Sequence, residues 1–295
     1  MHIGIAGVGR MGAAIAERLM AVGHNLTVWN RSAEKTKSLV QAGAGLAATP
    51  AELAAQVETI ITILTDARAI EQVYHGPHGL LAGDLAGKLV IDMSTVQPRS
   101  EIALAEKVRA RGAAFVECPV GGTTGPAKQG KLLGFVGAQP DEFARAKPVL
   151  EQLCRRVEFC GPVGSGALMK FAVNLPLMVY WQALGEAIAM AQPLNIEPER
   201  LIDLFGDSSG GANALKVRGA AIAAMLKGGD YPPATFNIDG GIKDMQAMLE
   251  QGRARGLQFP LVERALECYQ EAREARGGDD EISSVSVYWP NRKTA

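Results

Sequence analysis

The first 32 residues constrain the fold more than any other segment of this chain. A short apolar strand pattern at residues 2–6 runs directly into Gly-Val-Gly-Arg-Met-Gly at positions 7–12. An amphipathic helix pattern follows over residues 13–22, and a second strand pattern covers residues 26–29. This order predicts a βαβ unit with a glycine-rich first turn, which is typical of dinucleotide-binding domains.

Each glycine of the turn has an expected task. Gly7 allows the tight turn, Gly9 lets the backbone approach a pyrophosphate, and Gly12 lets the helix pack closely on the strands. The helix N-terminus adds free N–H groups and a positive dipole end for the phosphates. A glycine-rich loop without a special purpose is the alternative, and the flanking strands and helix favour the cofactor site. The residues expected to contact the cofactor are Gly7, Val8, Gly9, Arg10, Met11 and Gly12.

The end of the second strand bears on which dinucleotide binds. NAD-preferring sites usually place Asp or Glu there, to accept hydrogen bonds from the ribose hydroxyls. This chain has Asn30, Arg31 and Ser32 instead. An arginine can pair with a 2′-phosphate in a bidentate geometry, and a serine hydroxyl can add a donor. We therefore expect all three residues to contact NADP; the alternative for Arg31 is an ordinary solvated arginine.

Composition excludes several classes of function. The 295 residues suffice for two domains, and the net charge of −1 gives no electrostatic footprint for nucleic acid or an anionic membrane. The four cysteines lack a CxxC pair, so we expect no metal site and reduced thiols in a cytoplasmic protein. The chain opens on a strand pattern, which argues against a signal peptide. Its apolar runs are too short to span a bilayer.

Strand and helix patterns alternate through the first half of the chain. Apolar runs that are typical of strands buried on both faces alternate with helical patterns over residues 100–111 and 140–153. This alternation predicts a doubly wound, mostly parallel sheet in a domain of residues 1–162. The predicted strands after the first two cover residues 60–64, 88–92, 114–117, 132–136 and 156–159.

The second half has a different pattern. Residues 164–192 predict one long, largely apolar helix, interrupted only by Pro176 and Gly185, which we expect to be buried between domains or subunits. No convincing strand follows Phe159, so residues 163–295 are expected to form an all-α domain. Its polar tail, residues 277–295, is expected to be mobile at the end. The further predicted helices cover residues 198–205, 214–225, 238–255 and 260–276.

Two segments at predicted strand ends are candidate ligand contacts. Because the carboxyl ends of parallel strands face the ligand crevice, we expect Ser94 and Thr95 to touch the cofactor or substrate. A loop that leads into a helix capped by Ser100 is an equally good interpretation. We also expect Leu64 and Thr65 to contact the cofactor.

A glycine-rich loop at residues 119–127 is the third candidate. Gly121, Gly122 and Thr123 lie in a segment with four glycines and two threonines, which suits a backbone nest for a carboxylate. A flexible crossover loop is the better interpretation of this pattern alone.

Lys170 lies in the long apolar helix, with Asn174 one turn later on the same face. A lysine in apolar surroundings can act as a general acid or base, and Asn174 can orient it or hold a substrate oxygen. The alternative is a lysine whose charged end reaches water. Lys243 and Asp244 follow in a later helix, where a surface charge pair is the simpler interpretation.

Taken in order, these motifs resemble those of the β-hydroxyacid dehydrogenase family, which includes 3-hydroxyisobutyrate dehydrogenases and tartronate and succinic semialdehyde reductases. The resemblance extends over residues 3–285. The resemblance rests on five motifs: the cofactor turn, the Asp-Met-Ser-Thr segment at 92–95, the loop at 121–123, the helix with Lys170 and Asn174, and the Lys243-Asp244 pair.

The resemblance implies a fold and roles. The fold is a Rossmann domain followed by an all-α domain built on the long interdomain helix, in a homodimer or homotetramer. Lys170 would donate the proton in reduction and accept it in oxidation, with Asn174 supporting Lys170 and the substrate. Thr95 and Lys243 would contact the cofactor. Gly122 and Thr123 would present N–H groups to the substrate carboxylate, beside Ser94 and Gly121.

Two departures concern the substrate. The family segment usually reads Asp-Ala-Pro-Val-Ser-Gly-Gly, whereas residues 117–123 read Glu-Cys-Pro-Val-Gly-Gly-Thr. Gly121 therefore replaces a serine that helps to bind the substrate. Val173 stands where many members have an asparagine.

The sequence thus predicts an NADP-dependent oxidoreductase that interconverts a small β-hydroxy acid and an aldehyde acid, such as a semialdehyde or glyoxylate. An imine reductase or reductive aminase on the same scaffold is one alternative, although such enzymes usually carry Asp or Tyr in place of Lys170. A non-catalytic dinucleotide-binding assembly module is the other.

Overall fold

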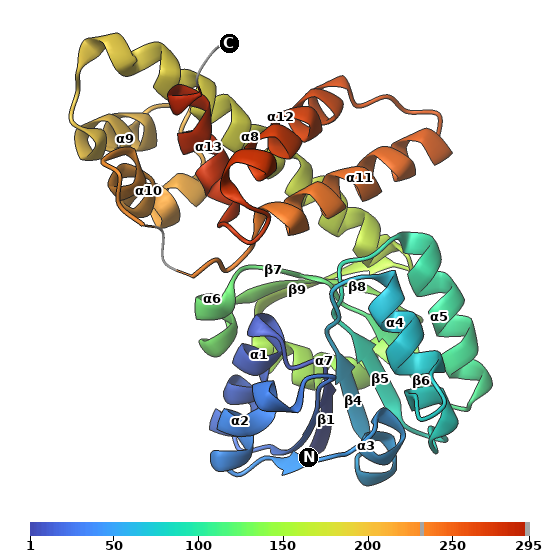
Figure 1. Ribbon diagram of the computed structural model, residues 1–295. Helices are drawn as coiled ribbons and strands as arrows, with labels where there is room; N and C mark the ends of the chain where they lie inside the picture. The colour runs from blue at the N-terminus through green and yellow to red at the C-terminus, as the bar shows by residue number, and fades with distance from the viewer. Residues whose placement is uncertain (231–232, 293–295) are drawn as a thin grey trace. The chain divides into compact units, whose positions relative to one another are not determined.

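The computed structural model describes residues 1–230 and 233–292 and divides the chain into two compact units, Met1–Lys170 and Phe171–Ala295. The first unit is a Rossmann-type α/β domain, and the second is helical (Figure 1). The long helix α8 begins in the first unit and ends in the second. The fold class expected from the sequence is therefore confirmed.

A nine-stranded sheet forms the centre of the first unit, with the order β3-β2-β1-β4-β5-β6-β8-β7 and with β9 paired to β8. The first six strands in this order, β3, β2, β1, β4, β5 and β6, are parallel to one another. Strand β8 runs antiparallel to both β6 and β7. The strands are β1 His2–Ala6, β2 Asn25–Trp29, β3 Gly45–Leu46, β4 Thr59–Thr62, β5 Leu89–Asp92, β6 Ala114–Glu117, β7 Val120–Gly121, β8 Leu132–Gly137 and β9 Cys154–Gly161.

Helices cover both faces of this sheet (Figure 1). One core cluster joins α1, α2, α6 and α7 to residues such as Ile5 and Val28, and another joins α3, α4 and α5 to residues such as Ile60 and Phe115. Burial on both faces explains why the central strands are continuous apolar runs. The helices are α1 Arg10–Ala21, α2 Lys37–Gln41, α3 Pro50–Gln56, α4 Ala67–His75, α5 Pro98–Ala110, α6 Thr124–Lys128 and α7 Pro140–Leu153.

Two strands of this sheet have only two residues each, and one of them, β7, lies within the segment 119–127 that the sequence predicts as a loop. Val120 and Gly121 form β7, whose partner in β8 is the pair Gly134 and Leu133. Gly45 and Leu46 form β3 beside β2. Two residues cannot display a period of two, so both strands are determined by their neighbours rather than by their own pattern.

The second unit packs around the later part of α8, Ser165–Ala191. Met178, Trp181 and Leu184 join a buried cluster with residues of the helices that follow. The described residues after β9 form no strand and contain one isolated bridge, between Asn237 and Glu281. These helices are α9 Pro198–Asp207, α10 Asn213–Leu226, α11 Ile238–Ala254, α12 Pro260–Arg276 and α13 Val285–Tyr288.

Part of the C-terminal tail is buried in the second unit. Ile282, Val285 and Val287 are buried in the core of the second unit, as are Ser283 and the other two serines between them. The buried side chains of Ile282, Val285 and Val287 keep the serines between them inside the second unit. The expectation of a mobile end concerns residues 293–295, which lie outside the described residues.

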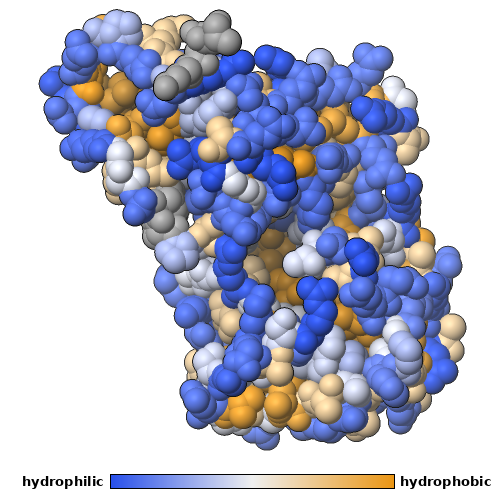
Figure 2. All heavy atoms as spheres, in the orientation of Figure 1, coloured by the Kyte–Doolittle hydropathy of each residue, from blue (hydrophilic) through white to orange (hydrophobic). Residues whose placement is uncertain are grey.

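The surface facing the viewer in Figure 2 is mostly hydrophilic, with apolar residues scattered among polar ones. Among the described residues, no helix combines the length and the apolar character needed to cross a membrane.

A buried ion pair ties the tail to the rest of the second unit. Arg218 of α10 pairs with Glu281, whose side chain is fully buried, and its guanidinium lies 5.9 Å from the centre of the Trp181 ring. Glu281 Oε2 also accepts hydrogen bonds from the N–H groups of Thr235 and Phe236, at 2.7 and 3.3 Å. Glu281 therefore joins the tail to α10 and to the segment that leads into α11.

Replacing Glu281 with Gln is expected to lower the free energy of unfolding by about 3 kcal/mol, because it leaves a largely buried guanidinium without its counter-charge. Urea unfolding measures this loss. The control is Glu199→Gln, which removes an exposed pair with Lys227 at 2.6 Å and should change stability little. Equal losses in the two variants would contradict the role assigned to the buried pair.

Candidate active site

The turn after β1 is shaped by close backbone contacts at two glycines. Gly7 has φ +104°, and a Cβ there would lie 2.4 Å from the carbonyl oxygen of Ile63. A Cβ on Gly12 would lie 2.0 Å from the carbonyl oxygen of Gly7. Neither position has room for a side chain, so the turn and the first turn of α1 approach each other in a way that requires glycine.

Gly9 differs from its two neighbours in the motif. It is the N-cap of α1, its helix has no side-chain cap, and a Cβ at this position would meet nothing within 4 Å. The space beside Gly9 is therefore open at the uncapped N-terminus of α1, which fits the pyrophosphate of a dinucleotide. Around Gly9, Val8 is buried, Arg10 is exposed and Met11 is half-buried.

Asn30 connects this turn to the end of β2. Its Oδ1 accepts a hydrogen bond from the N–H of Val8 at 3.0 Å, and its Nδ2 donates to the carbonyl of Ser32 at 2.9 Å. The amide thus holds the glycine turn and the strand end together. Arg31 and Ser32 are exposed beyond it, where they are accessible to a ligand.

A buried network joins the next two strand ends. Thr62 Oγ1 donates to Asp92 Oδ2 at 2.5 Å, and Asp92 Oδ1 accepts from the N–H of Ser94 at 2.7 Å. Ser94 Oγ then accepts from the N–H of Leu64 at 2.9 Å. Burial raises the pKa of Asp92, and these hydrogen bonds oppose the rise. The network fixes Ser94 and Leu64, and the next residues are exposed Thr65 and half-buried Thr95.

The glycine-rich loop after β6 is partly ordered by β7 and α6. Gly122 has φ +126°, and a Cβ there would come within 2.8 Å of Leu132 Cδ2. Thr123 is the N-cap of the short helix α6. Gly121 is less restricted, since the nearest atom to a Cβ there is Leu133 Cβ at an ordinary contact distance of 3.5 Å.

Glu117 is a buried residue at the end of β6, and the sequence alone does not indicate a role for it. Its Oε1 accepts hydrogen bonds from the N–H groups of Gly164, Gly166 and Ala167, at 2.8, 2.6 and 3.3 Å. These donors lie at the start of α8, so Glu117 caps the helix that carries Lys170. Burial raises the pKa of Glu117 to about 7, and the three N–H groups oppose the rise.

Glu101 of α5 is a second buried acid that the sequence did not indicate. Its side chain is buried, and within the described part of the chain neither carboxyl oxygen has a hydrogen-bond partner. Burial and the nearby carboxyls of Asp92 and Glu117 hold the pKa of Glu101 well above its usual range. Burial at this position therefore disfavours the charged form of the acid.

Lys170 and Asn174 lie four residues apart on α8, and each is only 9% exposed. Val173, between them in sequence, is 42% exposed. Four residues correspond to about one helical turn, so the lysine and the asparagine share a buried face that excludes Val173. A lysine that reaches freely into water is therefore not what the structure shows.

Asn174 is linked to the late Lys-Asp pair. Its Nδ2 donates to Asp244 Oδ2 at 3.3 Å, and Asp244 is buried in α11. Lys243 Nζ lies 3.2 Å from Asp244 Oδ1 and is partly exposed. The structure thus brings Asn174, Asp244 and Lys243 together, which their sequence positions alone did not indicate.

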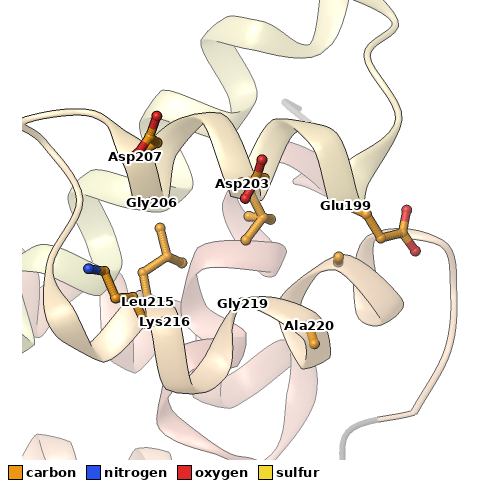
Figure 3. A pocket seen from close by; sticks show the side chains of 10 residues that line it. Glu199, Asp203, Gly206, Asp207, Leu215, Lys216, Gly219 and Ala220 are labelled. Atoms are coloured by element: carbon orange, nitrogen blue, oxygen red, sulfur yellow. The ribbon is translucent and has the colours of Figure 1, made fainter.

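The remaining candidates gather at one edge of the sheet. In the first unit, the turn at 7–12, the strand end at 30–32 and the segments at 64–65 and 94–95 all follow the carboxyl ends of parallel strands. A separate hollow of about 500 Å³ between α9 and α10 contains none of them (Figure 3). Acidic residues of α9, including Glu199 and Asp203, line that hollow.

Over the described residues, no group of three His, Cys, Asp or Glu side chains could hold a metal ion.

Two family models match the chain. The NAD binding domain of 6-phosphogluconate dehydrogenase matches residues 2–161, and the NAD-binding domain of NADP-dependent 3-hydroxyisobutyrate dehydrogenase matches residues 164–289. Glyoxylate/succinic semialdehyde reductase 1 of Arabidopsis thaliana is 31% identical over 292 residues, which cover 97% of each chain. The chain belongs to the β-hydroxyacid dehydrogenase family.

Solved structures agree with this assignment. The 3-hydroxyisobutyrate dehydrogenase of Salmonella typhimurium has a TM-score of 0.87 at 25% identity, covering 97% of this chain and 99% of its own. Psf3 in complex with NADP+ and 2-OPP has a TM-score of 0.86 at 26% identity, with the same coverage. This β-hydroxyacid dehydrogenase is thus an oxidoreductase with a nicotinamide dinucleotide as its cofactor.

The two glycines at 9 and 12 give a matched pair of variants. Gly12→Ala forces a Cβ against the Gly7 carbonyl and is expected to lower the melting temperature. Gly9→Ala meets open space and should leave the melting temperature unchanged while weakening binding of the reduced nicotinamide dinucleotide at least about 10-fold, because the methyl occupies the approach to the backbone. Thermal unfolding and fluorescence titration measure the two effects. Unaltered dinucleotide binding by Gly9→Ala would place the pyrophosphate elsewhere.

Proposed function

We propose that this family member is an NADP-dependent oxidoreductase that transfers hydride between the nicotinamide and a small β-hydroxy acid or the corresponding aldehyde acid. The observation that carries the proposal is the buried Lys170 on α8, with Asn174 on the same helical face. The aldehyde acids proposed are semialdehydes and glyoxylate, since glyoxylate and succinic semialdehyde appear in the name of the Arabidopsis relative.

Lys170 is assigned the proton transfer. In reduction its ammonium donates a proton to the carbonyl oxygen, and in oxidation the neutral amine accepts the hydroxyl proton. The bound cofactor supplies or accepts the hydride. The low exposure of Lys170 supports this role, because a shielded ammonium interacts more strongly with a developing alkoxide than a solvated one does.

Asn174 is assigned to orient Lys170 and the substrate oxygen. Asp244 Oδ2 accepts a hydrogen bond from Asn174 Nδ2, which fixes the orientation of the amide. Lys243, paired with Asp244, is assigned to the cofactor. A fixed amide orientation suits a residue that must hold a polar group in one position.

The preference for NADP rests on the end of β2. Arg31 and Ser32 are exposed next to the glycine turn, and no acidic side chain occupies this strand end. A guanidinium suits a 2′-phosphate, whereas the usual NAD-binding carboxylate would repel it. Asn30, Leu64, Thr65 and Thr95 complete the proposed cofactor contacts.

The substrate is assigned to the loops at 94–95 and 121–123. Ser94, Gly121, Gly122 and Thr123 would hold the carboxylate, with Lys170 and Asn174 at the reacting oxygen. A nest of backbone N–H groups, rather than an arginine, suits a small anion that must be released after each turnover.

We also propose the division into domains 1–162 and 163–295, a homodimer or homotetramer and a cytoplasmic location. Four free cysteines, three of them buried, support a reducing compartment. Large apolar side chains on the second unit support association with another copy; Met190, Val217 and Leu261 are 84, 79 and 70% exposed.

The proposal is tested by NADPH and NADH oxidation with glyoxylate, tartronate semialdehyde, methylmalonate semialdehyde, succinic semialdehyde and one cyclic imine. We expect turnover of an aldehyde acid with NADPH preferred. Lys170→Ala should lower kcat at least about 100-fold while retaining NADPH binding, because it removes the proton donor. Lys216→Ala, at an exposed position on α10, is the control.

Three outcomes would contradict the proposal in different ways. Near-normal turnover by Lys170→Ala would remove the role of that residue. Turnover of the imine with none of the acids would identify an imine reductase. Tight NADPH binding without turnover of any compound would identify a non-catalytic module.

Gly121→Ser is expected to lower the KM for the aldehyde acid about 10-fold, since one hydrogen bond to a charged group contributes about 1.5 kcal/mol. The space beside Gly121 accepts a Cβ without strain, so the melting temperature should not change. Gly121→Ala is the control, because it fills the same space without a hydroxyl. Identical KM values for the two variants would show that the hydroxyl does not reach the substrate.

A further inference from the structure

The start of α8 is held by one side chain from the sheet. Glu117 Oε1 accepts three N–H groups within the segment 164–167, and the shortest distance is 2.6 Å, to Gly166. An uncapped helix N-terminus leaves such donors without partners, and here they converge on a single oxygen. The position of that oxygen therefore determines where the first turn of α8 lies.

Space for this contact is provided by two glycines from different elements. A Cβ on Gly137 of β8 would lie 2.1 Å from Glu117 Oε1, and a Cβ on Gly166 would lie 3.0 Å from it. The same Cβ on Gly166 would lie 2.3 Å from the carbonyl oxygen of Phe135. The helix start therefore packs against the sheet as closely as a backbone without side chains allows.

Lys170 lies close to the helix start that Glu117 holds. It lies four residues after Gly166 in an unbroken helix, which corresponds to about 6 Å along the axis. Because α-helical geometry is stiff over a single turn, a shift of Gly166 relative to the sheet displaces Lys170 by a similar amount. Glu117 and Lys170 belong to the same compact unit as the glycine turn.

We propose that Glu117 is a positioning residue for Lys170: the reach of its side chain, by fixing the first turn of α8 against the ends of β6 and β8, sets the place of the lysine at the edge of the sheet. This proposal rests on the catalytic role proposed for Lys170. Its geometric part, that Glu117 holds the helix start, stands independently of the reaction.

The contacts indicate that the length of the Glu117 side chain matters more than its negative charge. All three N–H groups bind the same oxygen, and Glu117 Oε2 has no hydrogen-bond partner in the described residues. A neutral side chain of equal length can present one acceptor oxygen at the same place. A shorter carboxylate cannot, unless the helix start moves toward the sheet.

The test compares Glu117→Asp with Glu117→Gln. Glu117→Asp keeps the charge and loses one methylene of reach, so we expect kcat for the best aldehyde acid of the panel to fall at least about 10-fold, with KM and the Kd for NADPH changed less than about 3-fold. Glu117→Gln keeps the reach and should retain kcat within about 3-fold. The reverse order would show that charge is what matters and would overturn the proposal.

A second readout does not depend on activity. Hydrogen–deuterium exchange followed by mass spectrometry should show at least about 10-fold faster exchange across residues 164–170 in Glu117→Asp and little change in Glu117→Gln. Glu142→Asp is the matched control, since it shortens a carboxylate that bonds Arg109 and the N–H of Phe115 instead of α8. It should reduce stability without altering kcat or exchange at 164–170.

The two readouts separate the two proposals. A wild-type enzyme that is silent on every substrate would reject the proposed function, and exchange at 164–170 would still decide whether Glu117 holds the helix. Unchanged exchange and kcat in Glu117→Asp would overturn the positioning role. If Glu117→Asp does not fold, Gly137→Ala displaces the carboxylate oxygen instead and should give the same loss of kcat, and normal kcat there would overturn the proposal.

Discussion

Two carboxylates buried at adjacent strand ends are the constraint on which the candidate site depends. Asp92 and Glu117 are register partners at the ends of β5 and β6, and both are buried. A buried carboxylate without hydrogen-bond donors would strongly destabilise the fold, so nearby segments must supply them. The N–H of Ser94 and the first N–H groups of α8 do so. Satisfying these two acids therefore determines where the ligand loop and the long helix begin.

The elements predicted well from the sequence are those whose cause is local. The turn at 7–12 and the helix at 164–192 were recognisable because glycine spacing and apolar character act within a few residues. Glu117 was not recognisable as a cap, because a charged residue is ordinarily a surface residue and its donors lie 47 to 50 positions away. The two-residue strand β7 exists because β8 pairs with it.

The candidate site shows the same division. Lys170 and Asn174 share a helical face that follows from their spacing, and the structure adds that this face is buried. The bond from Asn174 to Asp244 joins α8 to α11 and depends on tertiary packing. The sequence predicts Asn30 only as a ligand contact, whereas in the structure its amide also holds the glycine turn to the strand end. The buried tail serines were missed for a related reason, since Ile282 and Val285 carry a polar segment into the core.

The clearance around Glu117 has a consequence for the history of this chain. The long acid fits because Gly137 and Gly166, from β8 and α8, both lack side chains where its oxygen lies. The three positions therefore cannot vary independently. Alanine at 137 requires a shorter residue at 117, whereas alanine at 166 would collide with the carbonyl oxygen of Phe135 whatever residue stands at 117. A chain with glutamate at 117 is therefore expected to keep glycine at 137.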